Sequence, residues 1–395
     1  MRIVIIGTHP DQTNGYAKVM YQHLKYFNTL KQHSFIYYGL QNFNVSVKSK
    51  ANFENIFIYN PLEHVSNDNI ENGFCYSHMN SFVKLTNPDI ILIFNDPVVT
   101  FTFLKHLEFY DCTKLSYLDI THDFIHNNLI TYIYSQCKTV IHINQHNFNT
   151  YNHLGNSDFI HHGIDTNTTI YSKEQICSDF KLNPNTFYIL NLNRNQPRKR
   201  YDIFIESIVL LLTLDTSRNF KVILGCNINE AYNLVELYEF FCNRHNITNI
   251  PFSHIFISFR FPSTYEENFI SKIYSLCDIG VNTCDGEGWG LCNFEHMYFK
   301  KPQIIPDIPV FRSYCNPNNS SLININHTYF IDSSRDFIGG MGNAVNPSDV
   351  AMAMLNYVDN SEVYETHSQN SHSSVSAFDW QTASHKLSTF FENLT

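Results

Sequence analysis

Two glutamates, Glu287 and Glu295, lie eight residues apart in the segment DGEGWGLCNFE, on either side of a glycine-rich bend. An apolar helical pattern, 291–299, follows the bend, so Glu287 precedes a helix and Glu295 lies about one turn inside it. The free N–H groups at the start of a helix can bind phosphate. Ionised carboxylates accept hydrogen bonds from vicinal hydroxyls. The pattern therefore predicts that the two acids bracket a diphosphate and hold the two sugars of a nucleotide sugar.

Cationic side chains gather in a second segment, LNRNQPRKRYD. Arg194 comes directly after a strand-like run, and Lys199 follows five residues later, where a helical pattern begins. The fork of arginine and the point charge of lysine suit a diphosphate, but a solvated basic loop explains these residues equally well. We interpret the wider basic run, Arg198 to Arg200, as a solvated loop or a helix start.

A third candidate site follows the first apolar run, where Asn14 and Gly15 stand at the start of a helical pattern. Glycine at a helix N-terminus lets backbone N–H groups approach an anion. A tight turn between strand and helix explains the pair at least as well.

Metal binding is a further chemistry to consider, because His122 and His126 lie four residues apart and could share a metal on one helical turn. However, no carboxylate pair of the Asp-x-Asp kind follows a predicted strand. We therefore predict no metal site and no cofactor.

The elements that position these residues belong to a chain of 395 residues, a length that favours two domains. The net charge of −10 argues against nucleic-acid binding, and no apolar run approaches the length of a membrane span. The opening run MRIVIIG is too short for a signal peptide and resembles a buried strand. The ten cysteines show no CxxC spacing, which favours a reducing, cytoplasmic setting.

Short apolar runs alternate with longer helical patterns along most of the chain, which predicts parallel α/β architecture. The polar stretch 163–185 is the predicted linker, and it would join two doubly wound halves near residue 175. The segment SQNSHSSVSAFDW is predicted to be a polar loop before a last helix. Ligands of such sheets bind at the carboxyl ends of strands, near the reversal in strand order. The predicted strands are 2–7, 89–96, 114–123, 139–145, 187–194, 220–227, 254–260, 278–284 and 303–306.

The spacing EGWGLCNFE resembles the E-x7-E motif of the retaining family 4 glycosyltransferases, which have the GT-B fold. NGYAK resembles the glycine loop of this family, NPDIILIFND its strand after Pro-Asp, and DITHD its histidine-containing loop. FIHHGID stands where the family has IPNGVD, and NLNRNQPRKRYDIFIES is similar to its GR…KG segment. NPSDVAMAMLNYV and FDW match the final helices. The similarity covers nearly the whole chain in the right order, which is more specific than any single motif.

This resemblance implies a GT-B fold, in which two Rossmann-like, doubly wound parallel-sheet domains face each other across a cleft. It places the N-terminal, acceptor-side domain at residues 1–170, completed by a C-terminal helix at about 378–395. The domain that binds the nucleotide sugar would then comprise residues 176–377.

The resemblance also implies a role for each matched residue. Arg194 and Lys199 would bind the donor diphosphate, and Glu295 would bind the ribose hydroxyls. Glu287 and His122 would hold the transferred sugar. The remaining donor contacts would come from Gly15 on the opposite wall, from the backbone of Gly288, Trp289 and Gly290, and from Leu291 at the helix start.

The sequence departs from the family pattern at four places. Asn14 replaces the first glycine of the usual Gly-Gly pair, and Asn193 replaces the glycine before Arg194. HHG at 161–163 replaces NG, and Trp289 stands where phenylalanine is usual. None of these changes removes a charge that the chemistry needs.

The predicted function is transfer of a hexose-type sugar from a nucleotide-diphosphate sugar to an acceptor, with retention of anomeric configuration. The expected acceptor is a sugar, glycan, lipid or protein, and peripheral contact with a membrane stays open. The alternative is a nucleotide-sugar-binding GT-B protein without catalysis, and the presence of all four residues Glu287, Glu295, Arg194 and Lys199 argues against it. A Rossmann dehydrogenase is disfavoured because GTHPDQTNG lacks the GxGxxG pattern.

Overall fold

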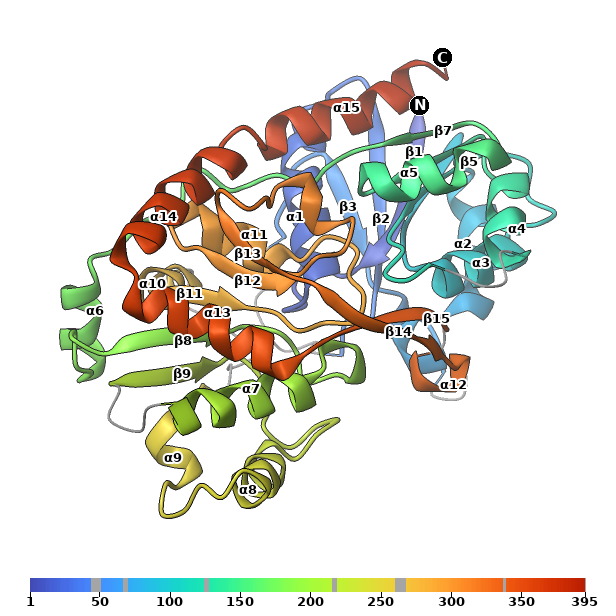
Figure 1. The fold of residues 1–395 in the computed structure, drawn as a ribbon. Coiled ribbons are helices and arrows are strands. Elements are labelled where there is room, and N and C mark those ends of the chain that lie inside the picture. Colours follow the sequence, from blue (N-terminus) through green and yellow to red (C-terminus); the bar gives the residue numbers. More distant parts are fainter. Residues whose placement is uncertain are drawn as a thin grey trace. The chain divides into compact units, whose positions relative to one another are not determined.

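The computed structural model describes residues 1–43, 51–66, 70–123, 128–214, 219–259, 268–336 and 339–394 (Figure 1). The chain divides into two compact units. The first unit comprises Met1–Gly163 with Phe378–Thr395, and the second comprises Ile164–Ala377. Within the described ranges, no helix has the length and apolar character needed to cross a bilayer.

The first unit contains a seven-stranded parallel sheet with the order β3-β2-β1-β4-β5-β6-β7. Its central strands are continuous apolar runs because both faces are buried; Ile3 pairs with Phe35 on one side and with Ile90 on the other. The strands are β1 (Arg2–Thr8), β2 (Ser34–Leu40), β3 (Ile56–Tyr59), β4 (Ile90–Asn95), β5 (Thr113–Leu118), β6 (Thr139–His142) and β7 (Ser157–Phe159). The α-helices of this unit are α1 (Gly15–Phe27), α2 (Met79–Thr86), α3 (Pro97–His106), α4 (Asn128–Gln136), α5 (Gln145–Tyr151) and α15 (Trp380–Glu392).

The second unit contains a six-stranded parallel sheet with the order β10-β9-β8-β11-β12-β13. Counted from the first strand of each unit, both sheets have the doubly wound order 3-2-1-4-5-6, to which the first sheet adds a seventh strand, so the predicted pair of parallel α/β halves is confirmed. The strands are β8 (Phe187–Asn191), β9 (Phe220–Leu224), β10 (Phe256–Ser258), β11 (Ile279–Val281), β12 (Gln303–Pro306) and β13 (Ser320–Ile323). The α-helices are α6 (Lys173–Phe180), α7 (Tyr201–Leu214), α8 (Leu234–Arg244), α9 (Phe252–Ile255), α10 (Phe269–Leu276), α11 (Leu291–Tyr298), α12 (Ser333–Asp336), α13 (Pro347–Asp359) and α14 (Ser361–Val375).

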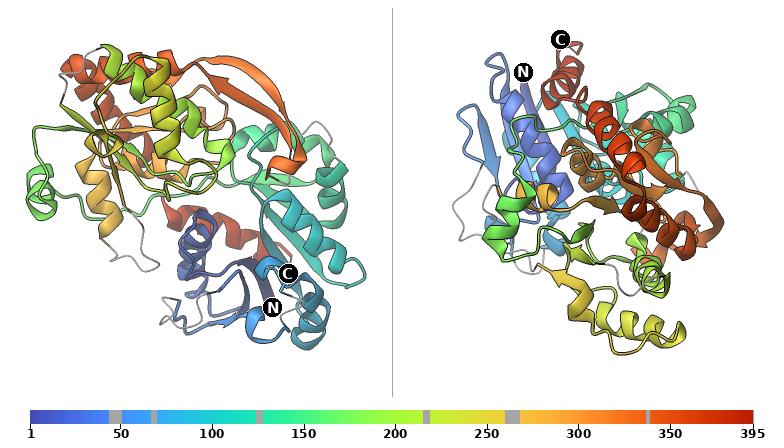
Figure 2. Two further views of the ribbon diagram at one scale, coloured as in Figure 1. Left: turned by 90° about the horizontal axis from the view of Figure 1, so that it is seen from below. Right: turned by 60° about the vertical axis from the view of Figure 1, so that its left-hand side comes forward.

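The last helix, α15, packs against α1, as Figures 1 and 2 show with α15 in red and α1 in blue. His23 of α1 is fully buried and bonds through Nδ1 to the Ser384 hydroxyl of α15 at 2.8 Å. The rings of Phe27 and Phe391 meet edge to face, with centroids 5.4 Å apart. These contacts join the two ends of the chain within the first unit.

The predicted linker, 163–185, is packed onto the second unit and contains α6. Thr168 shares a 2.7 Å hydrogen bond with Ser271, and the Tyr171 N–H donates to the Ser275 hydroxyl at 3.1 Å. Ser172 caps α6, whose two buried residues are too few to give a clear helical pattern in the sequence. The division of the chain therefore falls after Gly163, whereas the predicted boundaries were 170 and 176.

The prediction of a loop throughout SQNSHSSVSAFDW is wrong, because α14 continues to Val375. Only Ser371 and Val375 are buried in this helix, so its sequence lacks an apolar stripe. Partly buried Val363 and Tyr364 pack against the core of the second unit, and tertiary hydrogen bonds hold the later part of the helix. The Ser371 hydroxyl donates to the Asn319 carbonyl at 2.9 Å, and the Asn370 amide donates to the Asn318 carbonyl at 2.8 Å.

An antiparallel hairpin that the sequence did not predict projects from the second unit as an orange arm (Figure 2, left). It consists of β14 (Ile325–Ile331) and β15 (Gly340–Val345), and α12 follows β14. Gly342 leaves room for the Tyr329 ring, because a Cβ atom there would lie 2.8 Å from Cζ of that ring.

Candidate functional site

The candidate site of the second unit lies at the reversal of its strand order, where β8 and β11 are neighbours. One loop, 192–200, follows β8, and the other, 282–290, follows β11. Both leave the carboxyl edge of the sheet side by side, which is where parallel α/β sheets bind ligands. The E-x7-E segment and the basic segment, which are about 90 residues apart in the sequence, therefore meet.

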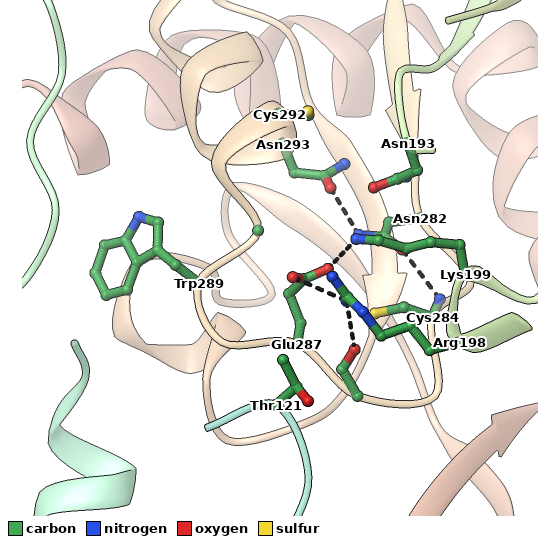
Figure 3. Close-up of polar contacts among 12 residues, drawn as sticks. Thr121, Asn193, Arg198, Lys199, Asn282, Cys284, Glu287, Trp289, Cys292 and Asn293 are labelled. Carbon is green, nitrogen blue, oxygen red and sulfur yellow. Dashed lines mark hydrogen bonds and ion pairs between the residues drawn. The ribbon is translucent and has the colours of Figure 1, made fainter. Parts of the chain in front are cut away.

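Glu287 lies between two cations (Figure 3). Its Oε1 is 3.1 Å from Nη1 of Arg198, and its Oε2 forms an ion pair with the Lys199 ammonium. The exposed fractions of the side chains are 9% for Glu287, 8% for Lys199 and 23% for Arg198, so the cluster is largely withdrawn from water. Burial alone would raise the pKa of Glu287, but the two cations outweigh it and lower that pKa to about 2.

Backbone contacts between the two loops build this cluster. The chain forms a tight 3-10 turn over Pro197–Lys199 and leaves it through Arg200 in a left-handed conformation (φ 50°). The Thr283 hydroxyl bonds to the carbonyl of Lys199 (3.2 Å) and to that of Arg200 (3.0 Å). The Asp285 N–H donates to the Arg198 carbonyl at 2.9 Å. The turn is thus fixed against the Glu287 loop, and its side chains have a defined direction.

The interpretation of Arg198–Arg200 as a solvated loop is wrong, although a helix, α7, does begin directly after it. Arg198 and Lys199 contact Glu287, and Arg198 also donates to the Gly286 carbonyl at 3.2 Å. Arg200 pairs with Asp202, with 2.7 Å between Nη2 and Oδ2. The partner of Arg200 is local, but Arg198 and Lys199 meet Glu287 because two loops converge here, and a local sequence pattern does not contain that information.

The structure does not bring Arg194 to this cluster. Its side chain is 63% exposed, and its guanidinium lies 3.5 Å from Glu230. The departure at Asn193 has a simple explanation, because this residue is not among those with a positive φ and glycine is not required there. Asn193 is buried and donates a hydrogen bond to Asn191 at 2.8 Å.

A second charged cluster, which the sequence did not predict, supports the Glu287 loop from the hairpin side. The fully buried carboxylate of Asp285 accepts hydrogen bonds from Arg335 and from the Tyr329 hydroxyl, each at 2.5 Å. The Asn343 N–H donates to the Asp285 carbonyl at 2.9 Å. Arg335 thus balances Asp285, whereas two cations face one carboxylate at Glu287. The Glu287 cluster therefore carries an excess positive charge.

The helix α11 begins at Gly290, beside Glu287. Gly290 has a φ of 83° and has no side chain that could cap the first N–H groups of the helix. The Asn293 and Phe294 N–H groups both donate to the Gly290 carbonyl at 3.0 Å. This is a helix start that can receive an anion next to the Arg198 and Lys199 cations.

We expect Gly290→Ala to lower the free energy of unfolding by roughly 2–4 kcal/mol, since an L-residue is strained at this φ and the site is overpacked. An added Cβ would lie 2.6 Å from Phe311 Cε1 and 2.9 Å from the Tyr314 hydroxyl oxygen. Urea unfolding would measure the loss. Gly290→Asn should recover only the part that is due to backbone strain, because its Cβ meets the same rings. An unchanged midpoint for the alanine variant would contradict the prediction.

Trp289 is a packing residue in this structure. Its side chain is 2% exposed and points away from Glu287 (Figure 3), and its ring meets Phe294 and Tyr314 at centroid distances of 5.2 and 5.3 Å. The Tyr314 hydroxyl donates to the Trp289 carbonyl at 2.7 Å. The predicted backbone contacts of Gly288, Trp289 and Gly290 with a donor remain a prediction.

Glu295 lies one turn along α11 and is partly exposed, and it accepts a 3.1 Å hydrogen bond from the Tyr274 hydroxyl. The buried face of α11 consists of Asn293, Phe294, His296 and Met297, whereas Leu291 and Tyr298 are partly exposed. Two of these buried residues are polar and are satisfied internally. Asn293 bonds to Asn282 at 2.9 Å and to Gln303 at 2.8 Å.

The predicted residues of the first unit also follow its strands. Gly15 is exposed at the start of α1, and Asn14 caps this helix by accepting a 2.9 Å hydrogen bond from the Ala17 N–H. Asn14 thus provides a capping side chain for α1 at a position where the family has glycine. His122 follows β5, is 4% exposed, and contacts the Thr121 hydroxyl through Nδ1 at 3.1 Å.

Of the two histidines considered for metal binding, His122 is described, whereas His126 lies outside the described residues. Among the residues that the structure does describe, no group of three or more His, Cys, Asp or Glu side chains could hold a metal ion.

Comparison with known proteins identifies the fold. No protein-family model matches the chain, and no curated protein matches it. Among solved structures, sucrose-phosphate synthase from Thermosynechococcus elongatus aligns over 100% of this chain and 99% of its own, with a TM-score of 0.72 and 12% identity. HepE from Anabaena, in complex with UDP and glucose, aligns over 100% of both chains (TM-score 0.68, 14% identity). A glycosyltransferase from Rickettsia africae covers 100% of this chain and 98% of its own (TM-score 0.67, 16% identity).

These structures are GT-B glycosyltransferases, and the likeness spans the whole length of this chain. The predicted fold class is therefore confirmed. The chain has the GT-B fold, with two Rossmann-like parallel-sheet domains.

Proposed function

We propose that the protein is a glycosyltransferase that transfers a hexose-type sugar from a nucleotide-diphosphate sugar to an acceptor, with retention of anomeric configuration. The observation that carries the proposal is the cluster of Arg198, Lys199 and Glu287 beside the start of α11 at Gly290. It combines an excess of buried positive charge with a helix N-terminus at the ligand-binding edge of a doubly wound sheet. A diphosphate fits such a place.

The chemistry would depend on charge stabilisation of the leaving group. Cleavage of the donor's glycosidic bond leaves a nucleoside diphosphate and an oxocarbenium-like sugar. Lys199, the neighbouring arginines and the N–H groups of α11 would stabilise the negative charge that develops on the diphosphate. Glu287 would face the positive sugar ring, and Glu295, one turn further along α11, would accept the ribose hydroxyls. No metal ion or cofactor has a part in this proposal.

The first domain would supply the acceptor side. We assign Gly15 and His122 to the donor sugar, as the family resemblance implies, because both follow strands of that domain's sheet. The acceptor is a sugar, a glycan, a lipid or a protein. None of the ten cysteines, all of which are described, forms a disulfide, which supports a cytoplasmic setting for the reaction.

The proposal is tested by incubating the purified protein with UDP- and GDP-sugars and measuring release of the nucleoside diphosphate. UDP-glucose is the first donor to try, because HepE was solved with UDP and glucose. Thermal shift would first select the donor, since a bound ligand raises the apparent melting temperature. Binding without release in the presence of a broad panel of acceptors would favour the alternative, a nucleotide-sugar-binding protein without catalysis.

A further inference from the structure

The carboxylate of Glu287 occupies the cationic site that the diphosphate of the proposed donor would bind. The Glu287 carboxylate lies against both Arg198 and Lys199, with one oxygen directed to each cation. A diphosphate binds arginine and lysine through the same charge-assisted hydrogen bonds. Because Lys199 is 8% exposed, its ammonium has little room for a second anion in addition to the first. Glu287 and a diphosphate would therefore compete for the same two cations.

The directions of the Arg194 and Arg198 side chains indicate which arginine would bind the diphosphate. Arg198 points to Glu287 and is 23% exposed, whereas Arg194 is 63% exposed and lies near Glu230. The Asp285 N–H bonds to the Arg198 carbonyl, and this contact ties the residue to the Glu287 loop. Arg194 matches the family spacing, but Arg198 has the position next to Lys199 and α11.

We propose that Glu287 acts as an internal stand-in for the donor diphosphate, and that Arg198 and Lys199 exchange its carboxylate for the diphosphate when the donor binds. This inference rests on the proposed function and specifies which residues recognise the donor. The exchange keeps both cations in contact with an anion in the empty site. It also releases the Glu287 carboxylate toward the sugar only when a diphosphate has taken its place. The low pKa of Glu287 agrees with a carboxylate that stays ionised throughout the exchange.

The exchange makes an unusual prediction, namely that removing a charged site residue strengthens binding. Glu287→Gln should bind inorganic pyrophosphate and UDP about tenfold more tightly than the wild type, because the competing carboxylate is lost. Glu287→Asp keeps the charge and should show no such gain. Glu239→Gln, an exposed residue of α8, is the matched control for the substitution itself. Isothermal titration calorimetry measures all four proteins.

The arginine assignment is tested in the same titrations and does not depend on how well Glu287→Gln folds. Arg198→Gln should weaken pyrophosphate binding about tenfold or more, and Arg194→Gln should weaken it less. Arg244→Gln is the matched control, since Arg244 is 60% exposed on α8. A larger loss for Arg194→Gln than for Arg198→Gln would overturn the assignment. Equal or weaker pyrophosphate binding by folded Glu287→Gln would overturn the exchange.

Pyrophosphate separates this inference from the proposed function, because the exchange requires a diphosphate and no base or sugar. Tighter pyrophosphate binding by Glu287→Gln supports the exchange even if no UDP- or GDP-sugar is turned over, and in that case only the proposed function fails. Absence of pyrophosphate binding by both the wild type and Glu287→Gln would overturn the exchange.

Discussion

Lys199→Met should slow sugar transfer by roughly 10²- to 10³-fold, the loss that follows removal of one preorganised charge from a developing anion. Methionine keeps the length of the side chain and removes its ammonium. Lys199 is the more buried of the two cations at Glu287 and lies on a turn fixed by Thr283. No other ammonium group is paired with Glu287 among the described residues. Release of nucleoside diphosphate under donor saturation would measure the effect.

The same substitution should also destabilise the second domain, and this effect must be separated from the chemistry. Removing one partner of a buried ion pair typically costs about 3–5 kcal/mol, although Arg198 remains to reduce the loss. The double variant Lys199→Met/Glu287→Gln removes both members of the pair and should regain stability without regaining transfer. Lys84→Met, at an exposed position of α2, is the control and should act as the wild type. A folded Lys199→Met protein with wild-type turnover would show that the leaving group is stabilised elsewhere.

Many strands of the two sheets could be predicted because parallel strands that are buried on both faces have continuous apolar sequences. Strands β1, β4, β8 and β12 were found in this way, as was the position of Glu287 after β11. The hairpin β14–β15 was not found. The second strand of the hairpin, GMGNAV, has no apolar alternation. Support of the Glu287 loop from this side depends on the contact between Arg335 of α12 and Asp285, which are 50 residues apart in the sequence.

The loops of the candidate site could be predicted, but the contacts among their side chains could not. Both Arg194 and Arg198 lie between β8 and α7 and carry the same charge, so spacing alone cannot separate them. The left-handed turn at Arg200 and its hydrogen bond to Thr283 determine the direction of the chain, and these belong to the tertiary structure. The burial of polar residues in α11 could not be predicted for a related reason, because the hydrogen bonds of Asn293 come from Asn282 and Gln303 on another loop and strand.

Mild acid should destabilise this protein strongly, because several histidines are buried in neutral form. Burial lowers the pKa of His23 and of His296 to about 3, and that of His142 to about 4. In the unfolded chain these groups have the ordinary pKa of about 6.5, so the unfolded state binds more protons below that pH. The stability is therefore fully present above pH 6.5 and is lost as the pH falls toward these lowered values.

The size of this effect follows from the linkage between protonation and unfolding. Each such histidine contributes about 1.4 kcal/mol per pH unit once the pH is well below 6.5, or about 2 kcal/mol at pH 5. His23 and His142 belong to the first domain and His296 to the second, so both domains should lose stability. Glu287, with a pKa of about 2, stays ionised between pH 6.5 and 5 and does not contribute to the slope in this window.

Urea unfolding at a series of pH values from 7.5 to 5 measures this slope, with a probe in each domain because the two need not unfold together. His23→Gln should be less stable than the wild type at pH 7.5, since it disturbs the contact with Ser384, yet its stability should fall less steeply with acid. The expected reduction in slope is about 1.4 kcal/mol per pH unit. His153→Gln, an exposed histidine, should keep the wild-type slope. An identical slope in His23→Gln would mean that His23 is not neutral in the folded protein, and that its burial beside α15 does not make the first domain sensitive to acid.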